Sequence, residues 1–298
     1  MATIGNFDGV HLGHQALLQH VRERGAACGL PSAAVVFEPQ PLEYLQPAAA
    51  PARLTRLREK IAALAATGIA RLVVLRFDAA LARLPATDFV ERILVAGLGV
   101  RWLLVGEDFR FGYRRAGDAA LLRELGARHG FTVAHVPSVR YEDARVSSTR
   151  VREALARADF AQARALLGRP YTLHGRVVHG DRRARGMGFP TANVSLHRRV
   201  SPLRGVYAAV VHGLAADPLP GVANIGTRPT VAGADCRLEV HLLDFARDIY
   251  GAHLQIEFRR KLRDERRFPS LAALAQQIAH DVAAARRAIA VNAEYDVP

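Results

Sequence analysis

The sequence predicts an α/β domain with a parallel sheet, followed by an antiparallel β-barrel with a closing C-terminal helix. In the first part of the chain, short apolar runs alternate with stretches of helical spacing, which is typical of parallel βα units. In the second part, β-rich runs follow one another with only turns between them, as in a barrel. The 298 residues suffice for two such cores. We place the boundary at Gly168, so the expected domains are residues 1–168 and 169–298.

The first domain is expected to contain strands that alternate with helices in a doubly wound sheet. The expected strands are Met1–Ile4, Ala33–Phe37, Leu72–Leu75, Trp102–Val105 and Phe131–Val136. Apolar residues at helical spacing mark helices that begin near Gly13, Leu57 and Phe89. A further helix is capped by Asp159 and ends at Gly168. Ligands bind beyond the carboxyl ends of the strands in such sheets, so we expect the functional loops there.

The second domain is expected to be a barrel of short strands with one helix after them. The expected strands are Tyr171–His179, Gly205–Val211, Leu219–Asn224, Cys236–Asp244 and Gln255–Phe258. Leu274, Ile278 and Val282 follow at helical spacing and mark the closing helix.

In the first domain, the prolines of residues 39–51 predict an extended loop.

The composition favours small phosphorylated ligands. The formal net charge is +13, but the basic excess is spread over both domains without a stripe or tail, so we expect no nucleic acid partner. Lys60 and Lys261 are the two lysines, and neither lies in a P-loop motif. Cys28 and Cys236 form no disulfide or zinc pattern. No membrane-spanning run or signal-peptide pattern is evident, so we expect a cytoplasmic protein and no membrane partner.

The glycine-rich turn at residues 5–14 is the clearest functional feature. Gly5 and Gly9 allow a sharp turn and a close approach of the backbone to a ligand. His11 and His14 stand three residues apart where a helix begins, so they share a face at a natural phosphate-binding position. As imidazolium donors they would stabilise charge that develops on a phosphate. The alternative is a pair of solvated residues without a role.

Two further segments of the first domain carry polar residues beyond expected strands. The loop after Val105 sets acids, arginines and aromatic rings between glycines, which suits phosphate binding and ring stacking, although a solvated turn is the alternative. Ser148 and Thr149 precede Arg152 at the start of a helix. Either they cap that helix, or their hydroxyl and N–H groups face an anion.

The second domain carries its chemistry on two segments. Residues 180–193 set glycines and arginines before a proline-fixed turn, which suits a phosphate. Thr191 and Asn193 would share a strand face, and their oxygens suit Mg²⁺, although turn stabilisation is the commoner role. Glu239 and His241 share the face opposite Leu238 on another expected strand, where either is a candidate base.

The string G-N-F-D-G-V-H-L-G-H resembles the FMN adenylyltransferase module of bacterial bifunctional riboflavin kinase/FAD synthetases, with a Rossmann-like nucleotidyl transferase fold. The resemblance extends to the loop after Val105 and to S-S-T-R-V-R at residues 147–152. It implies that His11, His14 and Arg152 are catalytic. The residues it implies for binding ATP or flavin are Gly5, Phe7, Asp8, Gly9, Asp108, Arg110, Ser148 and Thr149.

The string P-T-A-N at residues 190–193 resembles the riboflavin kinase module of the same family. The resemblance implies that Thr191 and Asn193 hold Mg²⁺ and that Glu239 accepts the 5′-hydroxyl proton of riboflavin. The remaining residues that it implies for binding ATP or flavin are Gly180, Gly186, Gly188, Pro190, Asn224 and Arg263.

The expected protein is therefore a bifunctional enzyme with ATP, riboflavin and FMN as substrates. One rival is a different nucleotidyl transferase whose β-domain does no chemistry, and another is a basic RNA-binding protein. Family members usually have a longer stretch before G-N-F-D-G, so an upstream start is one expectation. If the chain starts at Met1, we expect instead a short first strand that anchors the His11 turn poorly, with adenylyl transfer as the activity at risk. The sequence does not predict the oligomeric state.

Overall fold

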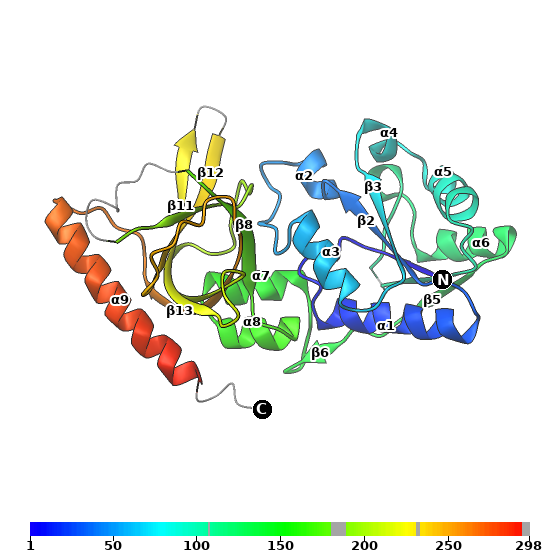
Figure 1. Ribbon diagram of the computed structural model, residues 1–298. Coiled ribbons are helices and arrows are strands. Elements are labelled where there is room, and N and C mark those ends of the chain that lie inside the picture. Colours follow the sequence, from blue (N-terminus) through cyan, green and yellow to red (C-terminus); the bar gives the residue numbers. More distant parts are fainter. Residues whose placement is uncertain (107, 180–188, 231–232, 294–298) are drawn as a thin grey trace. The chain divides into compact units, whose positions relative to one another are not determined.

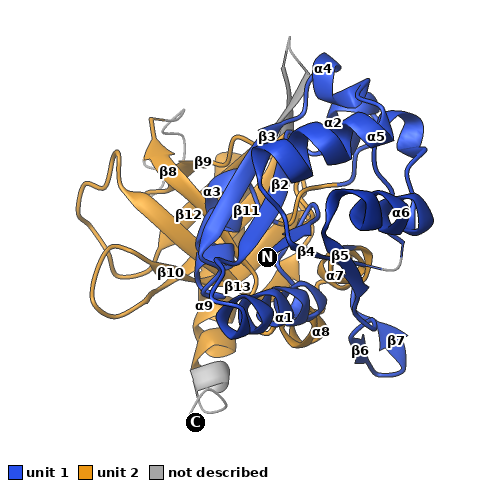
Figure 2. Ribbon diagram, turned by 90° about the vertical axis from the view of Figure 1, so that its right-hand side faces the viewer, with its two compact units in different colours: residues 1–51, 55–148 blue, residues 52–54, 149–298 orange. Residues whose placement is uncertain are grey.

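The computed structural model describes residues 1–106, 108–179, 189–230 and 233–293, and the chain divides into two compact units (Figure 1, Figure 2). Unit 1 comprises residues 1–51 and 55–148, and unit 2 comprises residues 52–54 and 149–298. The packing therefore changes after Ser148, whereas the functional boundary at Gly168 stays a prediction.

Unit 1 is built on a five-stranded parallel sheet in the order β3-β2-β1-β4-β5, which confirms the predicted sheet. Its strands are β1 (Ala2–Ile4), β2 (Ala33–Glu38), β3 (Arg71–Arg76), β4 (Trp102–Val105) and β5 (Thr132–His135). β1 has only three residues, yet it lies in the centre, pairs with β2 and β4, and is buried throughout. The N–H of Gly5 continues this pairing by donating to the Val35 carbonyl at 3.1 Å.

Helices cover both faces of this sheet, as in a doubly wound fold. On one face, α1 (Leu12–Ala27) and α3 (Leu57–Ala65) pack on β2 through Leu18, Leu64 and their neighbours. On the other face lie η1 (Phe89–Gly97), which is a π-helix, and α6 (Ala119–His129). The shorter elements are α4 (Ala79–Ala82), α5 (Ala86–Asp88), η2 (Tyr113–Arg115), β6 (Arg140–Tyr141) and β7 (Ala144–Arg145).

The extended loop expected at residues 39–51 is interrupted by a short helix, α2 (Pro41–Leu45). Pro41 occupies its first turn, where the missing N–H breaks no helical hydrogen bond. Glu43 then caps the helix, because its carboxylate accepts the N–H of Gln40 at 3.1 Å. The expectation of an uninterrupted loop is wrong here, because proline can begin a helix as well as end one.

Unit 2 contains a closed antiparallel barrel in the order β10-β11-β12-β9-β8-β13, which confirms the predicted barrel. Its strands are β8 (Thr172–Val178), β9 (Ala192–Ser195), β10 (Gly205–His212), β11 (Leu219–Thr230), β12 (Gly233–Leu242) and β13 (His253–Arg263). Its helices are α7 (Ser148–Ala156), α8 (Phe160–Leu167) and α9 (Leu271–Ala293). Asp159 and Gly168 cap the two ends of α8 as expected.

The closing helix α9 packs on the outside of the barrel (Figure 1). Val282, Ala285 and Ala288 of α9 contact Val206 and Val222 on β10 and β11. The helix therefore covers only part of the outer barrel face. Across the described residues, no helix combines the length and the apolar character needed to cross a membrane.

Residues 52–54 are a separate piece of unit 2, and all three of their carbonyls accept side-chain hydrogen bonds within it. Arg152 Nε donates to the Ala52 carbonyl at 2.6 Å. The Arg198 guanidinium donates to the carbonyls of residues 53 and 54, and the Tyr171 hydroxyl donates to the latter at 3.2 Å. Arg198 and Tyr171 are buried, so these bonds replace water that the carbonyls would otherwise need.

We expect Arg198→Ala to destabilise unit 2 by about 2–3 kcal/mol, because a buried and a part-buried carbonyl lose their charged donor. Calorimetry of the full chain is expected to show a melting transition lowered by roughly 5 °C or more. Arg199→Ala, at the exposed neighbouring position, is the matched control. Equal melting temperatures for the two variants would contradict this assignment.

Candidate active sites

The loop at residues 5–10 follows β1 and has an unusual backbone. Phe7, Gly9 and Val10 have left-handed φ angles of 46°, 82° and 44°. Glycine adopts such angles freely, whereas each of the other two residues carries about 1–3 kcal/mol of strain. Phe7 and Val10 are both 1% exposed, so the core beneath the loop holds them in place.

Asp8 fixes this loop from within. Its carboxylate oxygen Oδ1 accepts the Thr55 N–H at 3.0 Å and the Thr55 hydroxyl at 3.3 Å, while Thr55 Oγ1 accepts the Gly9 N–H at 2.9 Å. The Ser148 hydroxyl donates to the Asp8 carbonyl at 2.9 Å. Asp8 is 2% exposed, so its observed role is to hold the loop, and its direct contact with a ligand stays a prediction.

The two histidines lie together at the start of α1, as predicted. His11 is the N-cap residue, and its Nδ1 accepts the His14 N–H at 3.3 Å. The two rings stack with centroids 3.6 Å apart and planes 16° apart, and Phe7 lies 5.1 Å from His14. The two imidazoles therefore lie side by side at a helix N-terminus, a position whose dipole favours an anion.

The electrostatics of His14 differ from the sequence expectation. Burial lowers its pKa well below the usual range, and the charges of His11, Lys60 and Arg145 lower it further. A neutral imidazole is therefore favoured at neutral pH, and the imidazolium donor expected here is disfavoured. A neutral ring still donates one N–H to a developing charge.

Thr55 and Lys60 are the residues of this region that sequence reasoning missed as candidates. Lys60 is fully buried on α3, which is rare for lysine, and its charge acts on His14. Its one sequence signal is rarity, since lysine occurs twice in this arginine-rich chain. Thr55 gives no comparable signal, because its bond to Asp8 spans 47 residues.

The remaining residues predicted for the first domain lie on the loop after β4 and on α7. Asp108 pairs with Arg145, and Arg110 lies 3.4 Å from Asp118, with all four side chains partly or largely exposed. Thr149 is exposed at the start of α7, and Arg152 on α7 bonds to the Ala52 carbonyl. Their binding and catalytic roles stay predictions.

A second polar site lies on the outer face of the barrel, where strand register aligns three predicted residues. Glu239 on β12 is directly opposite Asn193 on β9 and Asn224 on β11. Direct antiparallel partners share a face, so the three side chains form one row. Leu238 and Val240 point the other way and are buried, as the alternation predicted. Asn224 Oδ1 is buried and makes no hydrogen bond to any described residue.

His241 supports this row from the next outward position of β12. Its Nδ1 lies 2.8 Å from the Pro190 carbonyl, so it donates to that oxygen, and Phe189 packs edge-on against its ring at 5.5 Å. His241 thereby holds the turn that carries Thr191 toward β9. Of the remaining candidates in this segment, Gly180, Gly186 and Gly188 lie outside the described residues.

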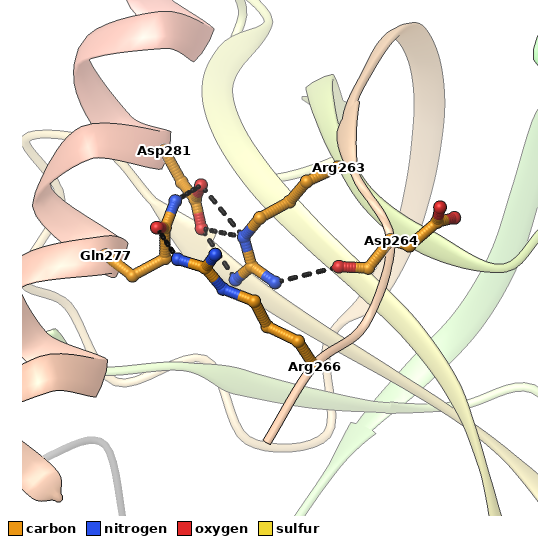
Figure 3. A network of polar contacts seen from close by, with 5 residues as sticks. All are labelled: Arg263, Asp264, Arg266, Gln277 and Asp281. Carbon is orange, nitrogen blue, oxygen red and sulfur yellow. Dashed lines mark hydrogen bonds and ion pairs between the residues drawn. The ribbon is translucent and has the colours of Figure 1, made fainter. Parts of the chain in front are cut away.

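The guanidinium of Arg263, at the end of β13, forms hydrogen bonds with other residues of unit 2 (Figure 3). It donates to both carboxylate oxygens of Asp281 on α9 at 2.8–3.1 Å, and to the Asp264 carbonyl at 3.0 Å. Direct binding of a ligand by Arg263 stays a prediction, but its observed partners belong to α9 and to the loop before α9.

Comparisons with known proteins match both parts of the chain. The FAD synthetase family matches residues 1–150, and the riboflavin kinase family matches residues 167–289. The chain is 54% identical to the bifunctional riboflavin kinase/FMN adenylyltransferase of Escherichia coli K12, over 95% of this chain and 91% of the relative. It is 53% identical to the protein of that name from Pseudomonas fluorescens, over 98% and 94% of the two chains.

A solved structure shares the fold over almost the whole chain. This crystal structure, of a macrolide-efflux protein from Streptococcus pneumoniae, aligns with a TM-score of 0.77 and 30% identity. It covers 96% of this chain and 93% of that one. The chain therefore shares both its parallel-sheet fold and its barrel fold with a protein of known structure.

We expect the stability of unit 1 to fall on acidification because of His14. Its pKa is lowered by folding, so its contribution is complete above the unfolded value of about 6.5 and is lost as pH falls below it. The loss is at most about 1.4 kcal/mol per pH unit for one proton. Fluorescence of Trp102, the one tryptophan, follows unfolding of unit 1. His14→Gln should flatten the dependence between pH 7 and 5, and an unchanged slope would contradict the assignment.

Proposed function

The chain belongs to the bifunctional riboflavin kinase/FMN adenylyltransferase family, and from this premise we propose how its residues divide two reactions between them. The riboflavin kinase domain transfers the γ-phosphoryl group of ATP to riboflavin, giving FMN and ADP. The FAD synthetase domain transfers AMP from a second ATP to FMN, giving FAD and pyrophosphate. The observation that supports this division most directly is that each matched family range contains its own polar site. Gly168 is the boundary that we propose between the domains.

In the FAD synthetase domain, the residues at the start of α1 would bind ATP. A phosphate oxygen of FMN attacks the α-phosphorus as the bond to pyrophosphate breaks, so negative charge grows on the α-phosphate oxygens. The N–H groups at the start of α1 and the N–H of a neutral His14 imidazole can donate to those oxygens. We propose His11 and His14 as the catalytic pair, with Ser148 as a phosphate ligand.

In the riboflavin kinase domain, Glu239 would take the proton of the 5′-hydroxyl group as its oxygen attacks the γ-phosphorus. The amide side chains of Asn193 and Asn224 lie opposite this carboxylate on the two adjacent strands. His241 would hold the Pro190 turn and so keep Thr191 in place.

Magnesium is the ion that the second site would suit. Asn193 lies directly across from Glu239, so its amide oxygen belongs to the same polar row as the carboxylate. Hard oxygen ligands of this kind fit Mg²⁺, which keeps several waters and needs few protein ligands. We propose that Thr191 and Asn193 hold the ion, which would neutralise charge on the ATP phosphates when bound.

A cytoplasmic location fits this proposal. Both cysteines are free, and Cys28 is exposed, as is usual where thiols stay reduced. ATP and riboflavin are the small molecules that the two sites would need, and FMN links the reactions. The even charge distribution gives no separate support for a nucleic acid partner.

Exchanging one residue in each site is expected to separate the two reactions. With riboflavin, ATP and Mg²⁺, Glu239→Gln should lower FMN formation by about 10²–10⁴-fold, as for loss of a general base. When FMN is supplied, the same variant should still form FAD. His14→Ala should show the reverse pattern, accumulating FMN without FAD.

Chromatography of the reaction products measures both outcomes in one experiment. Leu238→Val, at the buried position beside Glu239, is a control for disturbance of β12. The proposal fails if folded wild-type protein forms neither FMN nor FAD. The residue assignment fails if Glu239→Gln affects both reactions equally.

A further inference from the structure

Arg263 lies in the same cross-strand row as the kinase residues. Across neighbouring strands, the direct partners run from Asn193 through Glu239, Asn224 and Val206 to Arg263. The register between β10 and β13 shifts beside Val206, so pairing alone does not place the Arg263 side chain. Its guanidinium bonds to Asp281 of α9, and α9 packs on Val206 and Val222, so Arg263 lies on the side of the barrel that carries Glu239. Val206 in this row contacts α9, which places the helix beside the row.

The guanidinium of Arg263 is the centre of a network that joins this row to α9 (Figure 3). Its partner Asp281 is 4% exposed and also accepts Gln277 Nε2 at 2.7 Å. Gln277 in turn accepts a hydrogen bond from Arg266. The Phe268 ring packs against both Arg263 and Arg266. Its centroid is 5.5 Å from the guanidinium carbon of Arg263 and 5.0 Å from that of Arg266. The network thus fixes both ends of the loop at residues 264–268.

This loop lies against the strand that carries Asn224. A Cβ atom placed on Gly226 would come 2.1 Å from Oε1 of Glu265, so the carboxylate occupies the space above that glycine. Gly226 is two residues from Asn224 on β11, and residues two apart share a strand face. Glu265 therefore lies next to the row of polar residues, and the loop forms its border.

The order of the strands in this row assigns ATP and riboflavin to opposite sides of Glu239. This step rests on the proposed function, in which Thr191 and Asn193 face the ATP phosphates and Glu239 faces the riboflavin hydroxyl. Since Asn193 is on β9 and Asn224 is on β11, ATP would approach from the β9 side of Glu239. The body of riboflavin would then extend over β11, toward Glu265 and the loop.

We propose that Arg263 is a positioning residue for riboflavin rather than a ligand of phosphate. It holds Asp281 of α9 and the Asp264 carbonyl, and it thereby keeps the loop at residues 264–268 against Gly226 beside the flavin. It touches no reacting atom, so its loss affects capture of riboflavin more than the chemical step.

The test measures riboflavin kinase kinetics of the full chain with Arg263→Gln and Asp281→Asn. Both variants are expected to raise the KM for riboflavin about tenfold, while the KM for ATP and kcat stay within about threefold of wild type. FAD formation from supplied FMN should not change. A general loss of barrel stability would instead lower kcat, whichever of the two substrates is varied, without a selective rise in the KM for riboflavin.

Asp244→Asn is the matched control. Asp244 pairs with Arg286 of α9 at 2.8 Å, so this variant also removes an ion pair between α9 and the rest of unit 2, away from the loop. Its left-handed φ of 55° is tolerated by asparagine. We expect its KM for riboflavin to equal that of wild type.

Three outcomes decide the proposal. It is overturned if the KM for riboflavin stays within twofold of wild type in folded Arg263→Gln and Asp281→Asn, or if Asp244→Asn raises it equally. If Arg263→Gln does not fold, Asp281→Asn decides, because it keeps one oxygen for the guanidinium. Absence of kinase activity in the wild type would count against the proposed function itself.

Discussion

Strand β12 pairs with β9 on one side and with β11 on the other, and the register of those backbone hydrogen bonds is the constraint on which the kinase site depends. It sets Glu239 opposite Asn193 and Asn224, although 46 residues separate the first pair in sequence. A slip of one residue would turn Glu239 inward and bring Leu238 out, so the buried alternate residues protect the register. Closure of the barrel adds to this protection, since no strand has a free edge along which to slide.

The adenylyltransferase loop is held in a different way. Strand pairing brings β1 to the centre of its sheet, but the shape of the following loop depends on buried polar contacts. Asp8 and Thr55 supply these contacts, and they stabilise a backbone that Phe7 and Val10 would not adopt alone. The shape of such a loop is fixed before any substrate arrives, and stabilisation of a charged transition state requires this preorganisation. This chain thus combines a site set by strand register with a site set by a strained backbone.

Much of the architecture could be predicted because its signals are local. Apolar runs and glycine or proline punctuation located the parallel strands and most of the barrel. The H-x-G-H spacing predicted that the two histidines share a face, and the structure adds that their rings stack. The missed features are side-chain contacts across long sequence separations. Arg198 bonds to carbonyls more than 140 residues away, and the burial of Lys60 depends on the assembled core. The protonation of His14 was misjudged for the same reason, because its neighbours come from α3 and from the β6–β7 region.

The three residues at positions 52–54 affect how enzymes of this kind can be recombined. They lie within the sequence matched by the FAD synthetase family, yet they pack in unit 2, where Arg152, Tyr171 and Arg198 bind their carbonyls. Consider a chimera that joins the first 150 residues of one relative to the rest of another. Its segment 52–54 would come from the first relative, whereas the side chains that bind the segment would come from the second. Because the contacts go to backbone oxygens, the identity of the side chains at 52–54 matters less than the path of the chain. Crossovers between relatives would therefore tolerate sequence differences in this segment but not insertions or deletions.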